Sequence, residues 1–237
     1  MTKSKTSPYR IFIESMESKG FKMKKLSGLY AISDSKLSPD SKIFSYLDSA
    51  IKGGVSIFQY RNKDSKDSQI RGLVSDLQGF CDEKNVLFVL NDRRELALDL
   101  NVSAVHLGKE EVADFTHFRE SFKGIIGVSC YNDLNLALHF ENLKADYVAF
   151  GGMFKSKIKP NAVNCNLDIL RKAKEILKIP ICAIGGIDSN NIHLLKNADM
   201  IAVISSLWNL DSKDSIESNI ESKITQNARN LLKNFKS

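Results

Sequence analysis

The chain has 237 residues, of which 43% are hydrophobic and 26% are charged, a balance typical of an ordinary soluble globular protein with a full core. It contains no run of about 18 or more apolar residues, which argues against a membrane-spanning helix. The basic first residues precede no apolar signal segment. We therefore expect a cytoplasmic protein with no membrane partner.

The formal net charge of +6 is compatible with nucleic acid, an acidic membrane surface or small anionic substrates. Charge alone does not separate these partners. No aromatic-interleaved basic motif is present, however, and we expect no nucleic-acid partner. The cysteines lack the spacing of a zinc site and are expected to be buried free thiols. They are Cys81, Cys130, Cys165 and Cys182.

Residues 1–27 precede the first predicted strand and are expected to form an extension with a short amphipathic helix. From residue 29 onward, apolar runs rich in Val, Ile, Leu and Phe alternate with longer amphipathic segments. Such runs are typical of parallel strands that are covered on both faces. They occupy residues 29–33, 56–61, 87–91, 104–108, 125–129, 147–152, 181–186 and 200–205.

The segments between these runs have helical periodicity, and residues 40–52 carry an apolar stripe. Pro39 suits the first turn of that helix and Ser38 its N-cap, while Gly53-Gly54 ends it. Further helices are expected over 167–177, over 190–197 with Asp188 or Ser189 as cap, and over 213–235.

Strands that alternate with helices predict an α/β fold. Eight such units fit a TIM (β/α)8 barrel over residues 28–237 better than an open doubly wound sheet, which commonly has fewer strands. The sequence leaves the oligomeric state open.

In such barrels the chemistry lies at the carboxyl ends of the strands, and the polar residues of this chain gather there. Arg and Lys directed into one mouth suit phosphate or pyrophosphate oxygens, and two carboxylates on neighbouring strand ends suit Mg2+. Glycines after the seventh strand and the loop after the eighth match a barrel phosphate site. The candidates are Gln59, Arg61, Lys63, Asn91, Asp92, Glu111, Ser129, the loop 155–159, Gly185, Gly186 and Ser205.

Each candidate also has an ordinary structural interpretation. Arg61 and Lys63 can be solvated strand-end charges. Asp92 can be a helix N-cap, and Glu111 a first-turn residue favoured by the helix dipole. His106, inside an apolar strand, is more often a hydrogen-bonded core residue than a catalyst. The catalytic interpretation gains weight because all the candidates are predicted to face one mouth.

With these residues in place, eight motifs in barrel order resemble the thiamine-phosphate synthase family over residues 28–208. They are GLYAISD (28–34), FQYRNK (58–63), NDRRELAL (91–98), VHLGKEE (105–111), IGVSCY (126–131), ADYVAFGGMFKSKIK (145–159), AIGGI (183–187) and AVISSLW (202–208). The ordered series carries the resemblance, since the AIGGI type alone occurs in many phosphate-binding barrels.

The resemblance implies a transferase that uses Mg2+. It would join 4-amino-2-methyl-5-hydroxymethylpyrimidine pyrophosphate to 4-methyl-5-(2-phosphoethyl)thiazole, or to its carboxylated form, by a dissociative mechanism. The products would be thiamine phosphate and pyrophosphate.

The resemblance also implies a role for each matching residue. Asp92 and Glu111 would hold Mg2+, and Gln59 would help to place the pyrimidine. The thiazole phosphate would meet Gly186, Ile204 and Ser205. The pyrophosphate would meet Arg61, Lys63, Asn91, Ser129, Ser156 and Lys159, of which Arg61, Lys63, Ser129 and Lys159 would be catalytic.

The chain departs from the family's usual pattern at several positions, among them Lys109, which adds a positive charge near the expected metal site. Glu111 stands where a shorter Asp is usual, Asn62 replaces a Glu, and Ile158 removes a hydroxyl. Tyr131 occupies a position that is commonly His. A related barrel that tautomerises a thiazole phosphate is expected to rely on that histidine. A non-catalytic barrel that binds a phosphorylated ligand is the other alternative, and metal-dependent turnover distinguishes it.

Overall fold

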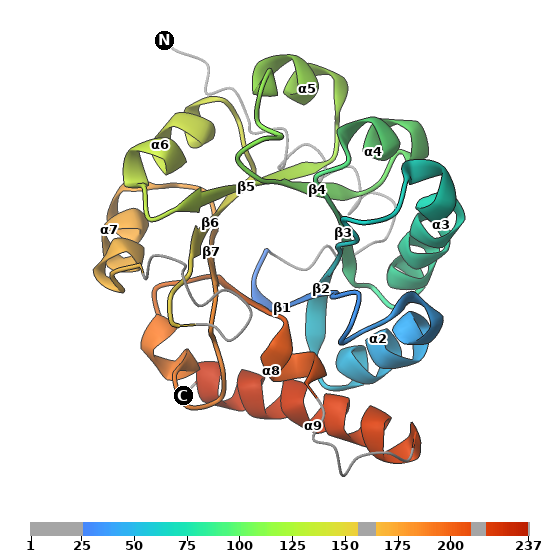
Figure 1. The fold of residues 1–237 in the computed structure, drawn as a ribbon. Helices are drawn as coiled ribbons and strands as arrows, with labels where there is room; N and C mark the ends of the chain where they lie inside the picture. Colours follow the sequence, from blue (N-terminus) through green and yellow to red (C-terminus); the bar gives the residue numbers. More distant parts are fainter. Residues whose placement is uncertain (1–25, 156–164, 210–216, 237) are drawn as a thin grey trace.

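Eight parallel strands close into one barrel in chain order, and helices form a ring around it (Figure 1). The computed structural model describes residues 26–155, 165–209 and 217–236. The predicted (β/α)8 barrel is confirmed. The predicted extension over residues 1–27 lies outside the described residues except for its last two, and it stays a prediction.

The strands begin and end within one or two residues of the predicted runs. They are β1 (Gly28–Ile32), β2 (Val55–Tyr60), β3 (Leu87–Asn91), β4 (Ala104–Leu107), β5 (Ile125–Tyr131), β6 (Tyr147–Gly151), β7 (Ile181–Ile184) and β8 (Met200–Val203). The helices are η1 (Asp40–Lys42), α2 (Ile43–Lys52), α3 (Asp67–Glu83), α4 (Arg94–Leu100), α5 (Phe115–Ser121), α6 (Leu134–Asn142), α7 (Asp168–Ile176), η2 (Ile192–Leu195), α8 (Ser205–Trp208) and α9 (Glu217–Lys236).

Side chains along each strand alternate between two apolar cores because successive residues of a strand point to opposite faces. In β1, Leu29 and Ala31 pack with the helices, whereas Tyr30 and Ile32 belong to the core of the lumen. The lumen is filled by buried side chains of all eight strands, such as Ile57, Val89, Ala104, Ile125, Tyr147, Cys182 and Met200. A filled lumen leaves the ends of the barrel as the places where a ligand can bind.

The predicted ends of the first barrel helix are partly right. Gly53 is the C-cap of α2 and Gly54 has a φ of +107°, as the Gly53-Gly54 pair predicts. The Ser38 cap is wrong. The Ser38 hydroxyl donates to the carbonyl of Asp34 and accepts from the N–H of Asp34. It therefore closes the turn before the helix and does not cap the helix. Pro39 takes the cap position without a side-chain hydrogen bond.

The predicted helix over 190–197 is wrong in length and in its cap. It is the four-residue 3-10 helix η2, and Asn191 precedes it. Asn191 accepts the N–H of Asp188 through Oδ1 and donates through Nδ2 to the carbonyl of Gly186. Asp188 accepts the N–H of Asn190. These side-chain bonds hold a turn where a longer helix was expected.

All four cysteines are buried free thiols, which confirms the expectation from their spacing. Within the described ranges, no helix is long and apolar enough to cross a membrane.

Candidate active site

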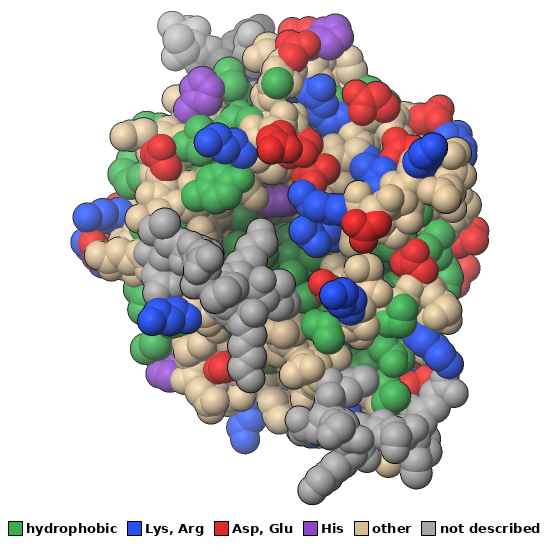
Figure 2. All heavy atoms as spheres, viewed as in Figure 1, with side chains coloured by type: hydrophobic (Ala, Val, Ile, Leu, Met, Phe, Trp, Pro, Cys, Tyr) green, Lys and Arg blue, Asp and Glu red, His purple; other side chains and the backbone are tan. Residues whose placement is uncertain are grey.

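Charged side chains gather at the carboxyl ends of neighbouring strands. Figure 2 shows Lys and Arg beside Asp and Glu around a hollow near the middle of one face of the molecule. The strand order puts the ends of β2, β3 and β4 next to one another. Residues that lie far apart in the chain therefore share this mouth.

Two carboxylates converge on Gly108, the residue that follows β4. A Cβ placed on Gly108 would lie 2.8 Å from Glu111 Oε2 and 3.5 Å from Asp92 Oδ1. The missing side chain thus leaves a space that two carboxylate groups border. Oxygen donors of this kind suit a hard divalent cation such as Mg2+, which takes its remaining ligands from water and phosphate.

Asp92 is held in place by its neighbours at the ends of β3 and β4. Its N–H donates to the carbonyl of His106, and it has a left-handed φ of 66°, which Asp tolerates better than most residues. Oδ1 accepts the N–H of Gly108 at 3.1 Å, and Oδ2 accepts Asn91 Nδ2 at 2.6 Å. Asp92 is therefore not an N-cap: Arg93 takes that position before α4.

The described residues contain no cluster of three or more His, Cys, Asp or Glu side chains that could hold a metal ion. The pair of Asp92 and Glu111 is smaller than such a cluster. It fits a cation that shares its coordination sphere with a phosphorylated ligand, and it does not fit a closed structural metal site.

One cationic side chain, Lys63, lies beside these carboxylates, and a second, Arg61, follows the last residue of β2. Lys63 Nζ is 3.5 Å from Asp92 Oδ2, and its side chain is 57% exposed. The N–H of Arg61 donates to Ser33 Oγ at 2.8 Å, which fixes the backbone where β2 ends. Among the described residues, the half-buried guanidinium of Arg61 has no carboxylate partner, so it is available to an anionic ligand.

Arg93 holds the loop that carries Lys63. Its Nη2 donates to the carbonyls of Asn62 at 2.6 Å and Ser65 at 2.7 Å, and its Nη1 pairs with Asp67. Asn62 braces the same loop because its Oδ1 accepts the N–H groups of residues 64 and 65. Arg93 has no role among the sequence-based predictions. Its place in the strand-end motif NDRRELAL was the available signal.

Gln59 and Ser129 lie at the inner end of the mouth. Gln59 is 2% exposed, and its Nε2 donates to Tyr30 Oη at 2.6 Å. Ser129 Oγ lies 2.9 Å from His106 Nε2. Burial lowers the pKa of His106 to about 4, against a smaller opposing effect of the Asp92 charge, so the ring is neutral. His106 is thus a hydrogen-bonded residue, as expected, with one nitrogen on a candidate site residue.

The loop after β6 contacts the loop after β7 at Gly185 and Gly186. A Cβ on Gly186 would lie 2.5 Å from the Phe154 carbonyl oxygen, and Gly186 has a φ of +65°. The N–H of Phe154 donates to the carbonyl of Gly185 at 2.9 Å. This close approach of two backbones requires glycine at residue 186.

The loop after β8 leads into α8, with Ile204 as its N-cap and Ser205 as its first residue. Both are half-buried. The first N–H groups of a helix have no partner within it and can bind an anion. The indole N–H of Trp208 donates to the carbonyl of Ile32 at 2.7 Å, which ties α8 to the end of β1.

Not every candidate residue can be located. Ser156 and Lys159, together with the Ile158 departure, lie outside the described residues. Tyr131 ends β5, is 45% exposed and has a φ of 54°. The remaining candidates all lie at the carboxyl ends of their strands.

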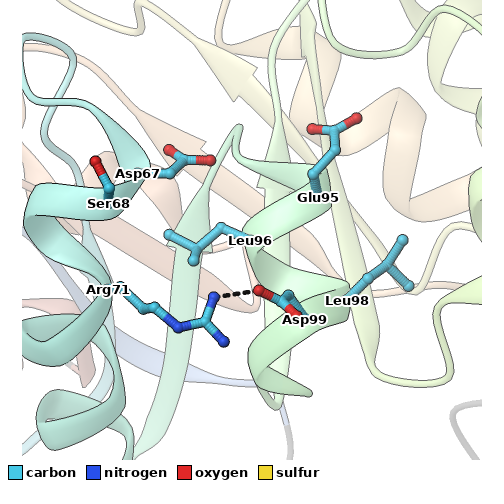
Figure 3. A pocket seen from close by; sticks show the side chains of 7 residues that line it. All are labelled: Asp67, Ser68, Arg71, Glu95, Leu96, Leu98 and Asp99. Atoms are coloured by element: carbon cyan, nitrogen blue, oxygen red, sulfur yellow. Dashed lines mark hydrogen bonds and ion pairs between the residues drawn. The ribbon is translucent and has the colours of Figure 1, made fainter.

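A separate pocket lies outside the barrel, between α3 and α4 (Figure 3). Its lining includes Asp67, Glu95 and the ion pair of Arg71 with Asp99, which spans the two helices. The charges of Arg71 and Asp99 already satisfy each other. This pocket is distinct from the mouth and holds none of the candidate site residues.

Known proteins of one family resemble the whole barrel. The family model described as "Thiamine monophosphate synthase" matches residues 29–207. A thiamine-phosphate synthase of Wolinella succinogenes is 47% identical over 187 residues, which cover 78% of this chain and 86% of that protein. One of Alcanivorax borkumensis is 36% identical over 197 residues, covering 81% and 90%.

The fold has a close counterpart among solved structures. The thiamine phosphate pyrophosphorylase of Pyrococcus furiosus superposes with a TM-score of 0.74 at 30% identity, covering 88% of this chain and 96% of that one. The matched span contains all the described candidate residues and, apart from Gly28 at the start of β1, every strand. The chain therefore belongs to the thiamine monophosphate synthase family, and it is an enzyme of the transferase class.

Proposed function

We propose that this chain makes thiamine phosphate at the mouth of its barrel, from a pyrimidine pyrophosphate and a thiazole phosphate. The observation that carries the proposal is the convergence of Asp92 and Glu111 on Gly108, with Lys63 3.5 Å from Asp92. This arrangement suits a metal-bound pyrophosphate. Membership of the family, with relatives named thiamine-phosphate synthase, supports the substrates.

The pyrophosphate end of the site would be built from β2 to β5. Asp92 and Glu111 would hold Mg2+, which when bound offsets charge on the pyrophosphate oxygens. Arg61 and Lys63 would bind the same oxygens with charged hydrogen bonds. Asn91 and Ser129, with Ser156 and Lys159 of the loop after β6, would complete this set. Gln59 would orient the pyrimidine from inside the mouth.

The chain's cations would act most strongly as the pyrophosphate leaves. Breaking the bond between the pyrimidine methylene and oxygen places negative charge on the departing group, and fixed cations stabilise that charge. The electron-rich aminopyrimidine tolerates a methylene cation, which the thiazole nitrogen then captures. Little proton transfer is needed, and positioning together with charge stabilisation would supply most of the rate.

The thiazole phosphate would bind between the loops after β7 and β8. Gly186 brings that backbone close to the loop after β6, and Ile204 and Ser205 begin α8. Backbone N–H groups and the Ser205 hydroxyl would receive the phosphate.

We also propose a cytoplasmic enzyme without a nucleic-acid partner, in which residues 1–27 form a separate extension.

Steady-state formation of thiamine phosphate from the two substrates tests this proposal. Product that forms with Mg2+ and disappears with EDTA is expected. Folded protein that releases no product would contradict the proposal and favour the thiazole tautomerase or a ligand-binding barrel. Conversion of the thiazole phosphate alone would identify the tautomerase.

A further inference from the structure

A continuous chain of hydrogen bonds crosses the lumen just beneath the mouth. It runs from Gln59 Nε2 to Tyr30 Oη (2.6 Å), to Tyr147 Oη (3.0 Å), to His106 Nδ1 (2.9 Å), and from His106 Nε2 to Ser129 Oγ (2.9 Å). The five residues come from β2, β1, β6, β4 and β5. We call this set the lumen relay. It links two candidate site residues, Gln59 and Ser129, that lie on different strands.

The barrel is shaped to hold the relay. Gly127 on β5 has no side chain, and a Cβ there would lie 1.9 Å from Cζ of Tyr147. The glycine thus makes room for the Tyr147 ring inside the lumen. The rings of His106 and Tyr147 stack with centroids 5.6 Å apart, and Tyr30 meets Tyr147 edge-on. Tyr30 and Tyr147 are fully buried, so water does not compete for their hydroxyls.

The Gln59 amide, which places its nitrogen on Tyr30, sets the direction of the relay. The Gln59 amide nitrogen can only donate, so Tyr30 Oη accepts and its own hydrogen goes to Tyr147. The Tyr147 hydrogen then goes to His106 Nδ1, and the ring proton is on Nε2, which donates to Ser129 Oγ. In the reverse direction, the buried Tyr30 hydrogen would have no acceptor among the described residues, which is unfavourable.

We propose that His106 is a positioning residue: the relay makes its Nε2–H donate to Ser129 Oγ and so leaves the Ser129 hydroxyl hydrogen free to donate into the mouth. At the other end, the amide of Gln59 has its nitrogen on Tyr30. Its Oε1, which has no partner among the described residues, is left to accept from a ligand. This inference rests on the proposed function in that Ser129 meets the pyrophosphate and Gln59 the pyrimidine.

The ring tautomer of His106 tests the direction of the relay without any turnover. The chain has four histidines, so nitrogen-15 spectra of the histidine side chains are simple, and loss of one signal set in His106→Gln assigns that residue. A neutral ring protonated at Nε2 is expected. A ring protonated at Nδ1 would overturn the proposal, because Ser129 would then donate inward to His106.

A double-mutant cycle between His106 and Ser129 tests the consequence for catalysis. His106→Leu removes the donor that orients the Ser129 hydroxyl. We expect kcat/KM for the pyrimidine substrate to fall about ten- to a hundred-fold, as for loss of the hydrogen bond from Ser129 to the charged pyrophosphate. The KM for the thiazole phosphate should not change. His106→Gln, which keeps an N–H near the same place, should restore most of the loss.

The cycle separates positioning from a general structural role. If His106 acts through Ser129, adding His106→Leu to Ser129→Ala should cost nothing further. Effects that multiply would overturn the proposal. His139→Leu, an exposed histidine on α6, is the matched control and should keep full activity.

A second variant covers the case in which His106→Leu does not fold. Tyr147→Phe keeps the ring in the space beside Gly127 but removes the central hydroxyl, and it should yield a mixture of His106 tautomers with lower activity. Tyr46 is a buried tyrosine on α2, and Tyr46→Phe is the control. It should leave the His106 tautomer and the activity unchanged. An unchanged tautomer in Tyr147→Phe would contradict the relay. Wild-type protein without turnover would refute the proposed function, while the spectra would still decide the relay.

Discussion

Gly108 is the residue on which the proposed metal site depends most closely, because its missing side chain leaves the space between two carboxylates. A methyl group there would lie 2.8 Å from Glu111 Oε2. We therefore predict that Gly108→Ala raises the Mg2+ concentration required for half-maximal activity about ten-fold or more, the usual effect of disturbing a metal ligand's surroundings. A titration of activity with Mg2+ measures this change.

Gly72 provides the control for that substitution. It lies on α3 with nothing within 4 Å of the place that a Cβ would take, so Gly72→Ala should leave the Mg2+ requirement unchanged. Equal Mg2+ requirements in Gly108→Ala and wild-type protein would remove Glu111 from the metal site.

His106 gives the fold a dependence on pH. Burial lowers its pKa from 6.5 to about 4. Between these two pH values, His106 is mostly protonated in the unfolded chain and mostly neutral in the folded chain. Stability that is fully present above pH 6.5 is thus lost as the pH falls through this window. At about pH 5 the lost free energy of unfolding from this residue is about 2 kcal/mol.

Urea unfolding at about pH 7.5 and about pH 5 measures this effect when wild-type protein is compared with His106→Gln. The wild-type protein should lose more stability than the variant on acidification. An equal loss in the two proteins would show that His106 is protonated as easily in the folded chain as in the unfolded one.

At the level of elements, the side chain of Arg93, which lies just after β3, holds the loop between β2 and α3. Arg93 donates to the carbonyls of Asn62 and Ser65 and pairs with Asp67, and this loop carries Lys63. We predict that Arg93→Gln raises the KM for the pyrimidine pyrophosphate by about ten-fold, because a charged contact that orders the loop is lost. Steady-state kinetics with each substrate varied in turn would measure it.

Arg71 is the matched control for Arg93. It also pairs with an aspartate, Asp99, but on the outside of α3, where its side chain is 49% exposed. Such exposed pairs contribute little. Arg71→Gln should therefore leave both KM values unchanged, and an equally small effect of Arg93→Gln would show that the loop needs no brace.

The sequence predicted the elements well because their signals are local. Apolar runs identify β1 to β8, and the residue after each strand must lie at the mouth of a closed barrel. The Ser38 cap failed because its hydroxyl bonds back to Asp34, a turn that competes with capping. The roles of Arg93 and His106 depend on partners on neighbouring strands. The periodicity of apolar residues in the sequence does not identify those partners.

The whole molecule brings together residues that no single local motif contains. The closed order of β1 to β8 sets Lys63, Asp92 and Gly108 side by side, and the relay beneath them joins Gln59 to Ser129. Membership of the thiamine monophosphate synthase family supports the proposal that this mouth binds a pyrophosphate. The pocket between α3 and α4 is lined by none of the candidate site residues.

The kinetics of Lys63→Ala and Asp92→Ala test most directly whether this mouth performs the reaction. The Lys63 side chain is 57% exposed and the Asp92 side chain 19%, and we expect circular dichroism to show a normal fold in each variant. We expect kcat/KM to fall by about a hundred-fold or more, as when a group that stabilises the leaving charge is removed. Unchanged kinetics in a folded variant would contradict the assignment and remove that residue from the active site.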